Sequence, residues 1–144
     1  MSLQPYCRKP VIKISPETSI TEACTLMEQN NVGSLVAEKN GKLCGIVTDR
    51  DIVIRGIAQG KGPKAKVRDV MTKDVKYCFD DQEVEEVTRN MADIQVRRLP
   101  VLNRDKRLVG ILSLGDIALS TDGQGAGDAL CGISRPGGEH TQTG

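Results

Sequence analysis

The apolar positions near the start of the chain change from a strand-like to a helix-like spacing. Residues 11–14 form a short, mostly apolar run that Pro16 ends, which predicts a strand. Ser19, with an acid three residues later, predicts the start of a helix. That helix is predicted to bury the residues at its i, i+3, i+4 and i+7 positions: Ile20, Ala23, Cys24 and Met27.

A hairpin and a second helix are predicted after the first helix. Residues 34–38 and 43–48 are apolar runs with strand character, and the turn residues at 39–41 join them. Residues 49–58 then return to a helical pattern. Together these elements form one β-α-β-β-α unit.

The same order of elements returns in the second half of the chain. A shift of 64 residues aligns Val11 with Val75, and one extra hairpin residue changes the shift to 65, which aligns Gly45 with Gly110. Self-similarity of this kind indicates repeated units. We therefore predict a mixed α/β (α+β) fold of two β-α-β-β-α repeats packed with pseudo-twofold symmetry. The second copy is predicted to have a strand at 75–78, a helix capped by Asp80 with Glu83 that buries Val84, Val87, Thr88 and Met91, a hairpin of 98–102 and 107–113, and a helix at 114–119.

Shifts in composition divide the chain into four parts. The first repeat is predicted at 8–59, a Gly/Pro/Lys linker at 60–66, the second repeat at 67–119 and a tail at 120–144. We interpret the linker as a solvated loop, with a basic patch as the alternative. Seven of the fifteen glycines lie in the last 24 residues, so the tail is expected to pack at most through 130–133. Its alternative role is contact with a partner.

Composition and charge exclude several classes of function. Two Tyr, one Phe and no Trp cannot build the aromatic platforms that bind single-stranded nucleic acid. A net charge of +1 gives no field for holding duplex DNA. No apolar run approaches the roughly 20 residues of a membrane-spanning helix, and the N-terminus does not resemble a signal peptide. We expect no membrane and no nucleic-acid partner, and a cytoplasmic location.

Cysteine and histidine usage argues against catalytic and metal sites. The five cysteines are widely spaced and include no C-x-x-C pair, and His140 is the only histidine. The spacing of zinc ligands is absent, and His140, which lies in the polar tail, would be the only possible base for Cys–His or Ser–His–Asp catalysis. We predict that the chain is not an enzyme, has no catalytic or metal residues and uses no cofactor.

One polar motif is duplicated where a strand leads into a helix. Thr48 and Asp51 in the first copy correspond to Ser113 and Asp116 in the second, each after Gly and two apolar residues. A hydroxyl at a helix N-terminus favours an anion such as phosphate, and a carboxylate one turn later can accept hydrogen bonds from a ribose diol. The alternative is that both pairs only cap their helices.

Arg97 and Arg98 add candidate phosphate ligands. They are adjacent on a predicted strand, so their side chains point to opposite faces and one of them can face a cleft. The planar guanidinium is suited to phosphate. Solvent-facing arginines are the alternative.

These motifs resemble a tandem pair of cystathionine β-synthase (CBS) domains, often called a Bateman module. The resemblance rests on the duplicated motif, on Val67-Arg68-Asp69-Val70-Met71-Thr72 before the second copy, and on 97–101, Arg-Arg-Leu-Pro-Val. It covers about residues 8–119 and is closest to stand-alone bacterial two-repeat proteins, including the hypoxic-response type. The first copy lacks an Asp-Val-Met-Thr segment and has Pro5-Tyr6-Cys7-Arg8 in its place.

The resemblance implies a regulatory sensor that binds AMP, ADP or ATP, or S-adenosylmethionine or NAD, in clefts between the repeats. Asp51 would hold ribose hydroxyls, Thr48 an oxygen of ribose or phosphate, and Arg97 or Arg98 the phosphates, while backbone near Leu99 would read adenine. The second cleft lacks arginines, so weaker phosphate binding is expected there. The first cleft would combine Thr48 and Asp51 with Val75, Lys76, Arg97, Arg98, Leu99 and Pro100, and the second would combine Ser113 and Asp116 with Ile12, Gly33, Ser34 and Leu35.

Two further expectations concern assembly and the competing function. The resemblance implies a homodimer, whereas the downstream protein partner is unknown. The alternative function is a ligand-free structural or interaction module that acts through its dimer surface or its C-terminal tail.

Overall fold

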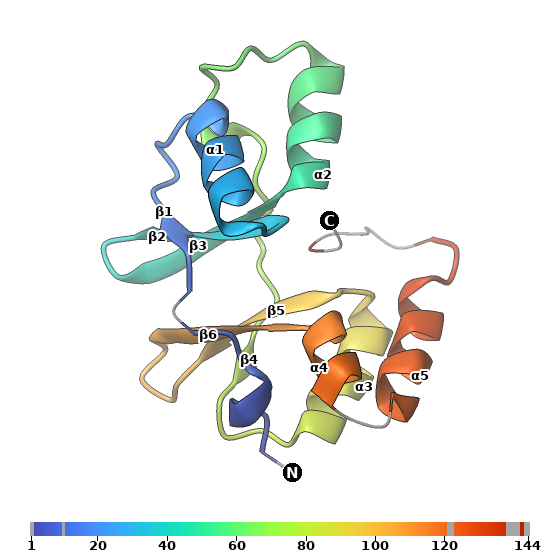
Figure 1. The fold of residues 1–144 in the computed structure, drawn as a ribbon. Coiled ribbons are helices and arrows are strands. Elements are labelled where there is room, and N and C mark those ends of the chain that lie inside the picture. The colour runs from blue at the N-terminus through green and yellow to red at the C-terminus, as the bar shows by residue number, and fades with distance from the viewer. Residues whose placement is uncertain (1, 10, 121–122, 138–141, 143–144) are drawn as a thin grey trace. The chain divides into compact units, whose positions relative to one another are not determined.

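The computed structural model describes residues 2–9, 11–120, 123–137 and 142, and the chain forms two compact units (Figure 1). We name Ile12–Val75 the first-repeat unit, and Met1–Val11 with Lys76–Thr143 the second-repeat unit. Each has its own hydrophobic core between helices and a three-stranded sheet. The core side chains are mainly Val, Ile, Leu, Met and Ala, as expected for a chain with so few aromatic residues.

The first-repeat unit has the predicted order of elements. In its sheet β1 is parallel to β2 and β2 is antiparallel to β3. Asn40 and Gly41 both have positive φ angles, 55° and 77°, which a two-residue hairpin turn of this hand requires. Its elements are β1 (Lys13–Ile14), α1 (Ile20–Asn30), β2 (Ser34–Lys39), β3 (Lys42–Thr48), α2 (Asp49–Asp51), η2 (Ile52–Gly56), η3 (Ile57–Gln59) and η4 (Val67–Asp69).

The second-repeat unit repeats that topology and adds a helix. In its sheet β4 is parallel to β5 and β5 is antiparallel to β6. Its elements are η1 (Gln4–Tyr6), β4 (Cys78–Phe79), α3 (Val84–Ile94), β5 (Arg98–Leu102), β6 (Leu108–Ser113), α4 (Leu114–Ser120) and α5 (Gln124–Ile133). The mixed α/β fold with two similar units is therefore confirmed.

The predicted helix faces are mostly correct. Ser19 Oγ accepts from Glu22 N at 3.1 Å, as a capping residue should. All four residues expected on the buried face of α3 are buried, but Cys24 on α1 is exposed. The predicted Asp80 cap is also wrong, because α3 starts after Glu83, whose side chain makes no capping bond.

The second helix of the first repeat is not the regular helix predicted. Only Asp49–Asp51 is α-helical, and Ile52–Gly56 winds into a wider π-type turn before η3. The sequence Ile52-Val53-Ile54 places three β-branched residues in one turn, where they crowd a regular helix. Val53, Ile54 and Ile57 are left 55%, 47% and 62% exposed.

Each unit also receives a short segment that precedes the opposite repeat in sequence. Thr72 exchanges two backbone hydrogen bonds with Ile46, at 2.9 and 3.0 Å, and Arg8 does the same with Ile111, at 2.9 and 3.2 Å. A Cβ on Gly45 would meet Met71, just as one on Gly110 would meet Cys7. Residues 3–8 therefore occupy in one unit the place that 67–72 occupy in the other, although their sequences differ.

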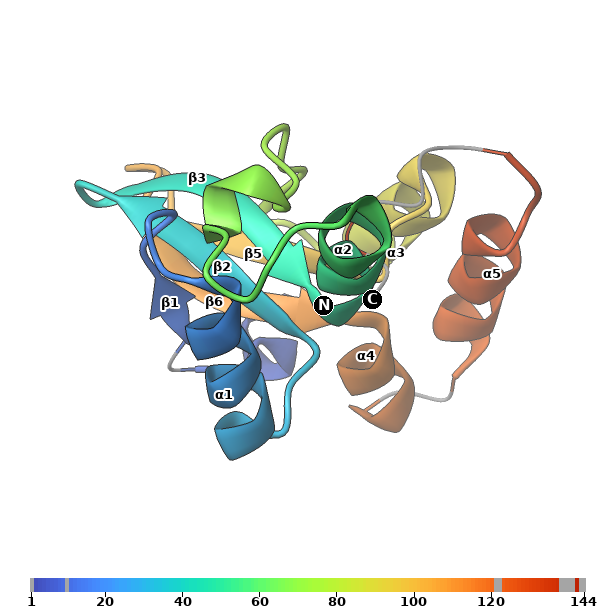
Figure 2. The ribbon, with the colours of Figure 1, turned by 90° about the horizontal axis from the view of Figure 1, so that it is seen from above.

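The tail is more ordered than its composition suggests. Helix α5 packs beside α3 (Figures 1 and 2) and buries Ala126, Ala129 and Ile133. Leu130, which was expected to pack, is 44% exposed. The prediction that only 130–133 packs is therefore wrong, because small residues at helical spacing let α5 approach α3 closely.

Candidate functional site

The Thr48–Asp51 motif forms a reciprocal cap at the start of α2. Thr48 Oγ1 accepts from Asp51 N at 3.1 Å, and Asp51 Oδ2 accepts from Thr48 N at 3.0 Å. Both residues are buried. Thr48 and Asp51 therefore cap this helix, and the two bonds hold the carboxylate at a fixed position at the start of α2.

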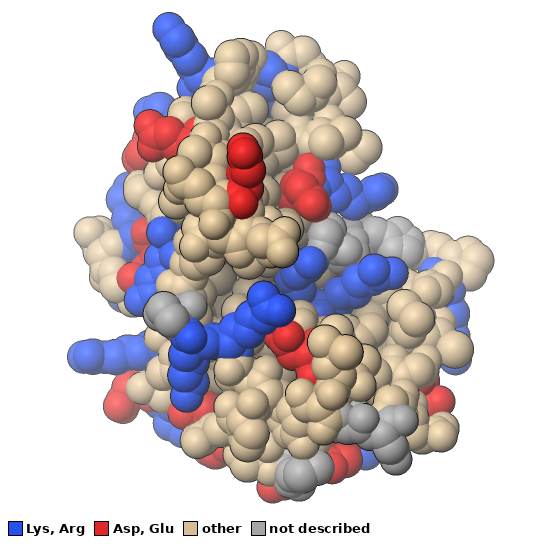
Figure 3. Space-filling view, in the orientation of Figure 1, with Lys and Arg blue, Asp and Glu red and all other residues tan. Residues whose placement is uncertain are grey.

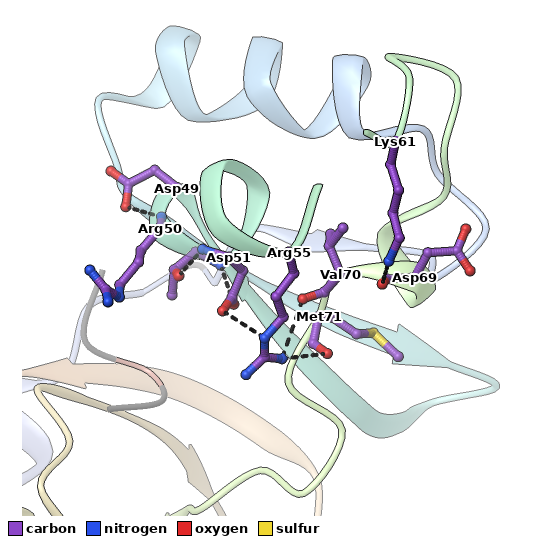
Figure 4. A network of polar contacts seen from close by, with 9 residues as sticks. Asp49, Arg50, Asp51, Arg55, Lys61, Asp69, Val70 and Met71 are labelled. Carbon is purple, nitrogen blue, oxygen red and sulfur yellow. Dashed lines mark hydrogen bonds and ion pairs between the residues drawn. The ribbon is translucent and has the colours of Figure 1, made fainter. Parts of the chain in front are cut away.

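Arg55, which the sequence reasoning missed, lies beside this carboxylate. Its Nε is 4.0 Å from Asp51 Oδ1, and its Nη1 donates to the carbonyls of Met71 at 3.3 Å and Val70 at 3.5 Å (Figure 4). The i, i+4 spacing from Asp51 was the available signal. Arg55 therefore links the helical segment after the motif to residues 70–71, which precede the second repeat.

Burial raises the pKa of the Asp51 carboxyl, whereas the hydrogen bonds from Thr48 and the charge of Arg55 oppose that rise. An acid whose pKa is higher in the folded chain than its ordinary 3.8 loses stabilising effect as the pH rises through the folded value. At neutral pH the ionised Asp51 therefore destabilises this unit.

Asp51→Asn is accordingly expected to gain stability over the wild type as the pH rises from 4 to 7. Asparagine keeps an acceptor for Thr48 N but carries no buried charge, and the gain at pH 7 should be about 1 kcal/mol or less. Urea unfolding at several pH values measures it. A pH-independent difference would contradict this role for burial.

The Ser113–Asp116 motif caps its helix differently. Ser113 Oγ accepts from Asp116 N at 3.0 Å. Arg8 Nε donates to Asp116 Oδ1 at 3.2 Å, while Asp116 Oδ2 is buried and has no hydrogen-bond partner among the described residues. A buried carboxylate oxygen without a donor is costly, so this oxygen is suited to receive a hydroxyl of a ligand.

Each motif lies beside the start of a strand of its own unit. Ser34 is opposite Thr48, and Arg98 is opposite Ser113, in the two antiparallel pairs. Asp49 N donates to the Gly33 carbonyl at 3.0 Å. The remaining predicted site residues differ in exposure: Leu35, Leu99 and Pro100 are buried, Ile12, Val75 and Arg98 are half-buried, and Lys76 and Arg97 are exposed. Leu35 and Leu99 can therefore offer a ligand only backbone groups. The pairing of each motif with the strands of the opposite repeat stays a prediction.

Lys61 and Lys64 of the linker line a groove of about 830 Å³ in the first-repeat unit, together with Arg55 and Arg68. Lys61 donates to the Asp69 carbonyl at 2.8 Å (Figure 4), and Arg68 pairs with Glu17 at 3.1 Å. The groove is therefore rich in cations, as in the basic-patch interpretation. Elsewhere, positive and negative side chains are interspersed over the face shown in Figure 3.

Burial makes three of the cysteine thiols harder to ionise. Burial raises the pKa of the Cys78 thiol to about 12, and it also raises the pKa of Cys7 and Cys44. No group of three or more His, Cys, Asp or Glu in the described ranges is placed to hold a metal ion. No helix within those ranges has the length and apolarity needed to cross a membrane.

Known proteins are similar to this chain in sequence and in fold. CBS domain-containing protein YhcV of Bacillus subtilis is 39% identical over 125 residues, which are 86% of this chain and 89% of that protein. Hypoxic response protein 1 of Mycobacterium tuberculosis is 35% identical over 107 residues, 73% of this chain and 74% of that protein. The crystal structure of the CBS domain pair of MJ0100, in complex with 5′-methylthioadenosine and S-adenosyl-L-methionine, superposes with a TM-score of 0.77 at 29% identity, covering 86% of this chain and 98% of that one.

The resemblance noted from the sequence is therefore confirmed. The CBS domain family matches residues 3–56 and 67–120, which include the segments before both repeats. The chain belongs to the CBS domain family and carries two CBS domains in tandem.

Proposed function

We propose that this chain is a non-catalytic regulatory module that binds an adenosine-containing ligand: AMP, ADP, ATP, S-adenosylmethionine or NAD. The observation that carries the proposal is the duplicated hydroxyl–carboxylate pair at two helix starts. In the second pair, Asp116 Oδ2 is buried and the described part of the chain offers it no donor. The MJ0100 CBS pair in complex with two adenosine compounds supports it. The cytoplasmic location stays a prediction.

Each part of the ligand has a counterpart among the side chains or backbone groups of the candidate site. Asp51 and Asp116 accept from ribose hydroxyls, since charged acceptors make the stronger hydrogen bonds. Arg97 and Arg98 bind phosphate, and backbone groups at Lys76 and near Leu99 bind the base. The Gly33–Ser34 segment has no arginine, so phosphate contributes less at its site.

A thermal-unfolding panel of adenine nucleotides, S-adenosylmethionine and NAD tests the proposal. A ligand at a hundredfold excess over its Kd adds about 2.7 kcal/mol, or roughly 5–10 °C for a domain of this size. GMP and UMP serve as controls for the base. If no adenosine compound raises the transition, the sensor function is wrong and the interaction module is favoured.

An exposed apolar face on the first-repeat unit supports the homodimer. In the second-repeat unit α5 packs on α3 and buries Thr88, whose repeat counterpart Cys24 is exposed on α1. The described residues provide no similar helix over α1, η2 and η3, where Val53, Ile54 and Ile57 lie exposed. We propose that a second copy of this chain covers that face.

Ile54→Glu is expected to convert the dimer to a monomer. A charge placed in a buried apolar interface loses its hydration and should weaken association at least tenfold. Light scattering coupled to size exclusion measures the mass. Leu119→Glu is the matched control, because Leu119 is the repeat counterpart of Ile54 and is 89% exposed. A wild-type monomer, or equal effects of both changes, would refute this surface.

A further inference from the structure

One glutamine near the end of the chain is bound by backbone groups of the second-repeat unit. Gln142 is only 1% exposed. Lys76 N donates to its Oε1 at 2.9 Å, and its Nε2 donates to the carbonyls of Lys76 at 3.2 Å and Arg98 at 3.0 Å. Arg97 N donates to the Gln142 carbonyl at 3.4 Å. Both ends of the side-chain amide are therefore recognised.

The backbone of Gln142 has a conformation that glutamine rarely adopts. Its φ angle is +57°, in the left-handed region, which costs roughly 1–2 kcal/mol for a residue with a Cβ. Such a residue persists only where its surroundings hold it. The hydrogen bonds around Gln142 provide that restraint, so the receiving surface is complementary to this side chain.

Pro100 explains why this surface can receive an amide. In the first-repeat unit the Ile12 carbonyl accepts from Val36 N at 3.3 Å, which continues the ladder between β1 and β2. The repeat counterparts of these two residues are Lys76 and Pro100, and proline has no N–H to donate. The Nε2 group of Gln142 donates to Lys76 where the ladder donor is missing.

A primary amide and an adenine ring present the same pair of groups. Each is planar and carries an NH₂ donor beside an acceptor, so each can bind to one backbone N–H and a neighbouring carbonyl. The groups that contact Gln142 belong to Lys76, Arg97 and Arg98, which are also the residues proposed to hold the base and the phosphates.

We propose that Gln142 is a built-in competitor that occupies the adenine position, and that an adenosine compound binds there by displacing it. The inference rests on the proposed function and adds its regulation. When a segment of the chain fills the site, ligand binds only to the molecules in which the site is open. The apparent affinity is then the intrinsic affinity multiplied by the fraction of open molecules. Anything that draws the C-terminal segment away therefore sensitises the module to its ligand.

Gln142→Ala in the full chain tests the proposal, with AMP as the probe in calorimetric titrations and Gln59→Ala, an exposed glutamine, as the matched control. The variant is expected to bind AMP roughly 3- to 30-fold more tightly than the wild type, while the control binds like the wild type. Without AMP, the amide hydrogen of Lys76 should exchange faster in Gln142→Ala, because its acceptor is gone.

The outcomes separate this inference from the function on which it rests. Tighter AMP binding together with faster exchange at Lys76 supports the competition. AMP binding with equal affinity in both proteins overturns it and leaves the nucleotide function intact, and unchanged exchange at Lys76 overturns it as well. Absence of binding to either protein by every adenosine compound overturns the proposed function itself, and the competition with it.

Discussion

AMP binding is expected to be lost when both motif carboxylates are removed, in the double variant Asp51→Ala with Asp116→Ala. Hydrogen bonds to a charged acceptor contribute about 1.5–3 kcal/mol each, so loss of the acceptor for a ribose diol should weaken binding a hundredfold or more. Asp116 Oδ2 has no partner within the described part of the chain, and Asp51 is held by Thr48 at 3.0 Å. Both carboxylates are therefore held in position to accept from a hydroxyl.

The matched control is Asp49→Ala, which removes an exposed carboxylate from the same turn of α2. Within the described residues, its Oδ1 accepts from the adjacent Arg50 N at 2.8 Å and makes no longer-range contact (Figure 4), so AMP affinity should not change. Circular dichroism checks that each variant is folded. Wild-type affinity in a folded double variant would show that the two pairs are caps and nothing more.

The close contact between α5 and α3 is expected to make the second-repeat unit sensitive to added volume at Gly132. A Cβ on Gly132 would lie 2.8 Å from the Ala92 Cβ and 3.0 Å from the Ala92 carbonyl oxygen, and backbone atoms cannot move aside cheaply. Alanine usually stabilises a helix by up to about 1 kcal/mol over glycine. Here Gly132→Ala is instead expected to destabilise the second-repeat unit by roughly 1–3 kcal/mol, through overpacking.

Gly127→Ala, in the same helix, is the matched control and is expected to change the stability in the opposite direction. Nothing lies within 4 Å of a Cβ built at Gly127, so this change should stabilise the unit by about 0.5–1 kcal/mol through helix propensity alone. Urea unfolding of both variants measures the difference. If Gly132→Ala were as stable as Gly127→Ala, α5 would not be packed closely on α3.

Local pattern was sufficient to predict most of the two repeats. The apolar spacing of α1 and α3 places the buried residues correctly, since a helix that packs on a sheet needs one continuous apolar face. The turn at Asn40–Gly41 and the Ser19 cap follow from chemistry that involves only neighbouring residues. Cys24 was wrongly predicted to be buried, because helical spacing shows on which face of the helix a residue lies but not whether another element covers that face.

The features that were missed depend on contacts between distant parts of the chain. Residues 3–8 match 67–72 in position and not in sequence, because their shared role is backbone pairing with β6 or β3 and packing beside a glycine. Helix α5 is rich in glycine and was expected to be largely unpacked, yet small residues are what close contact with Ala92 requires. Gln142 carried no local signal, since its partners lie 44 and 66 residues away in sequence.

The candidate site was predicted in its residue types and only partly in its geometry. Thr48, Asp51, Ser113 and Asp116 lie at helix starts as expected, but the two carboxylates are not equivalent. The first has Arg55 beside it, whereas the second has Arg8 on one oxygen and, as far as the described residues extend, no donor on the other. Differences of this kind come from segments outside the motif, so the duplicated sequence alone could not show them.

The most direct test of the account is a calorimetric titration of Gln142→Ala with AMP and with inosine monophosphate. The two nucleotides share ribose and phosphate, but inosine reverses the donor and acceptor that adenine presents to the Lys76 N–H and carbonyl. A site built to pair with polar groups rejects a mismatched ligand strongly, so AMP should bind at least tenfold more tightly. Equal affinity for the two nucleotides, or binding of neither, would contradict the account.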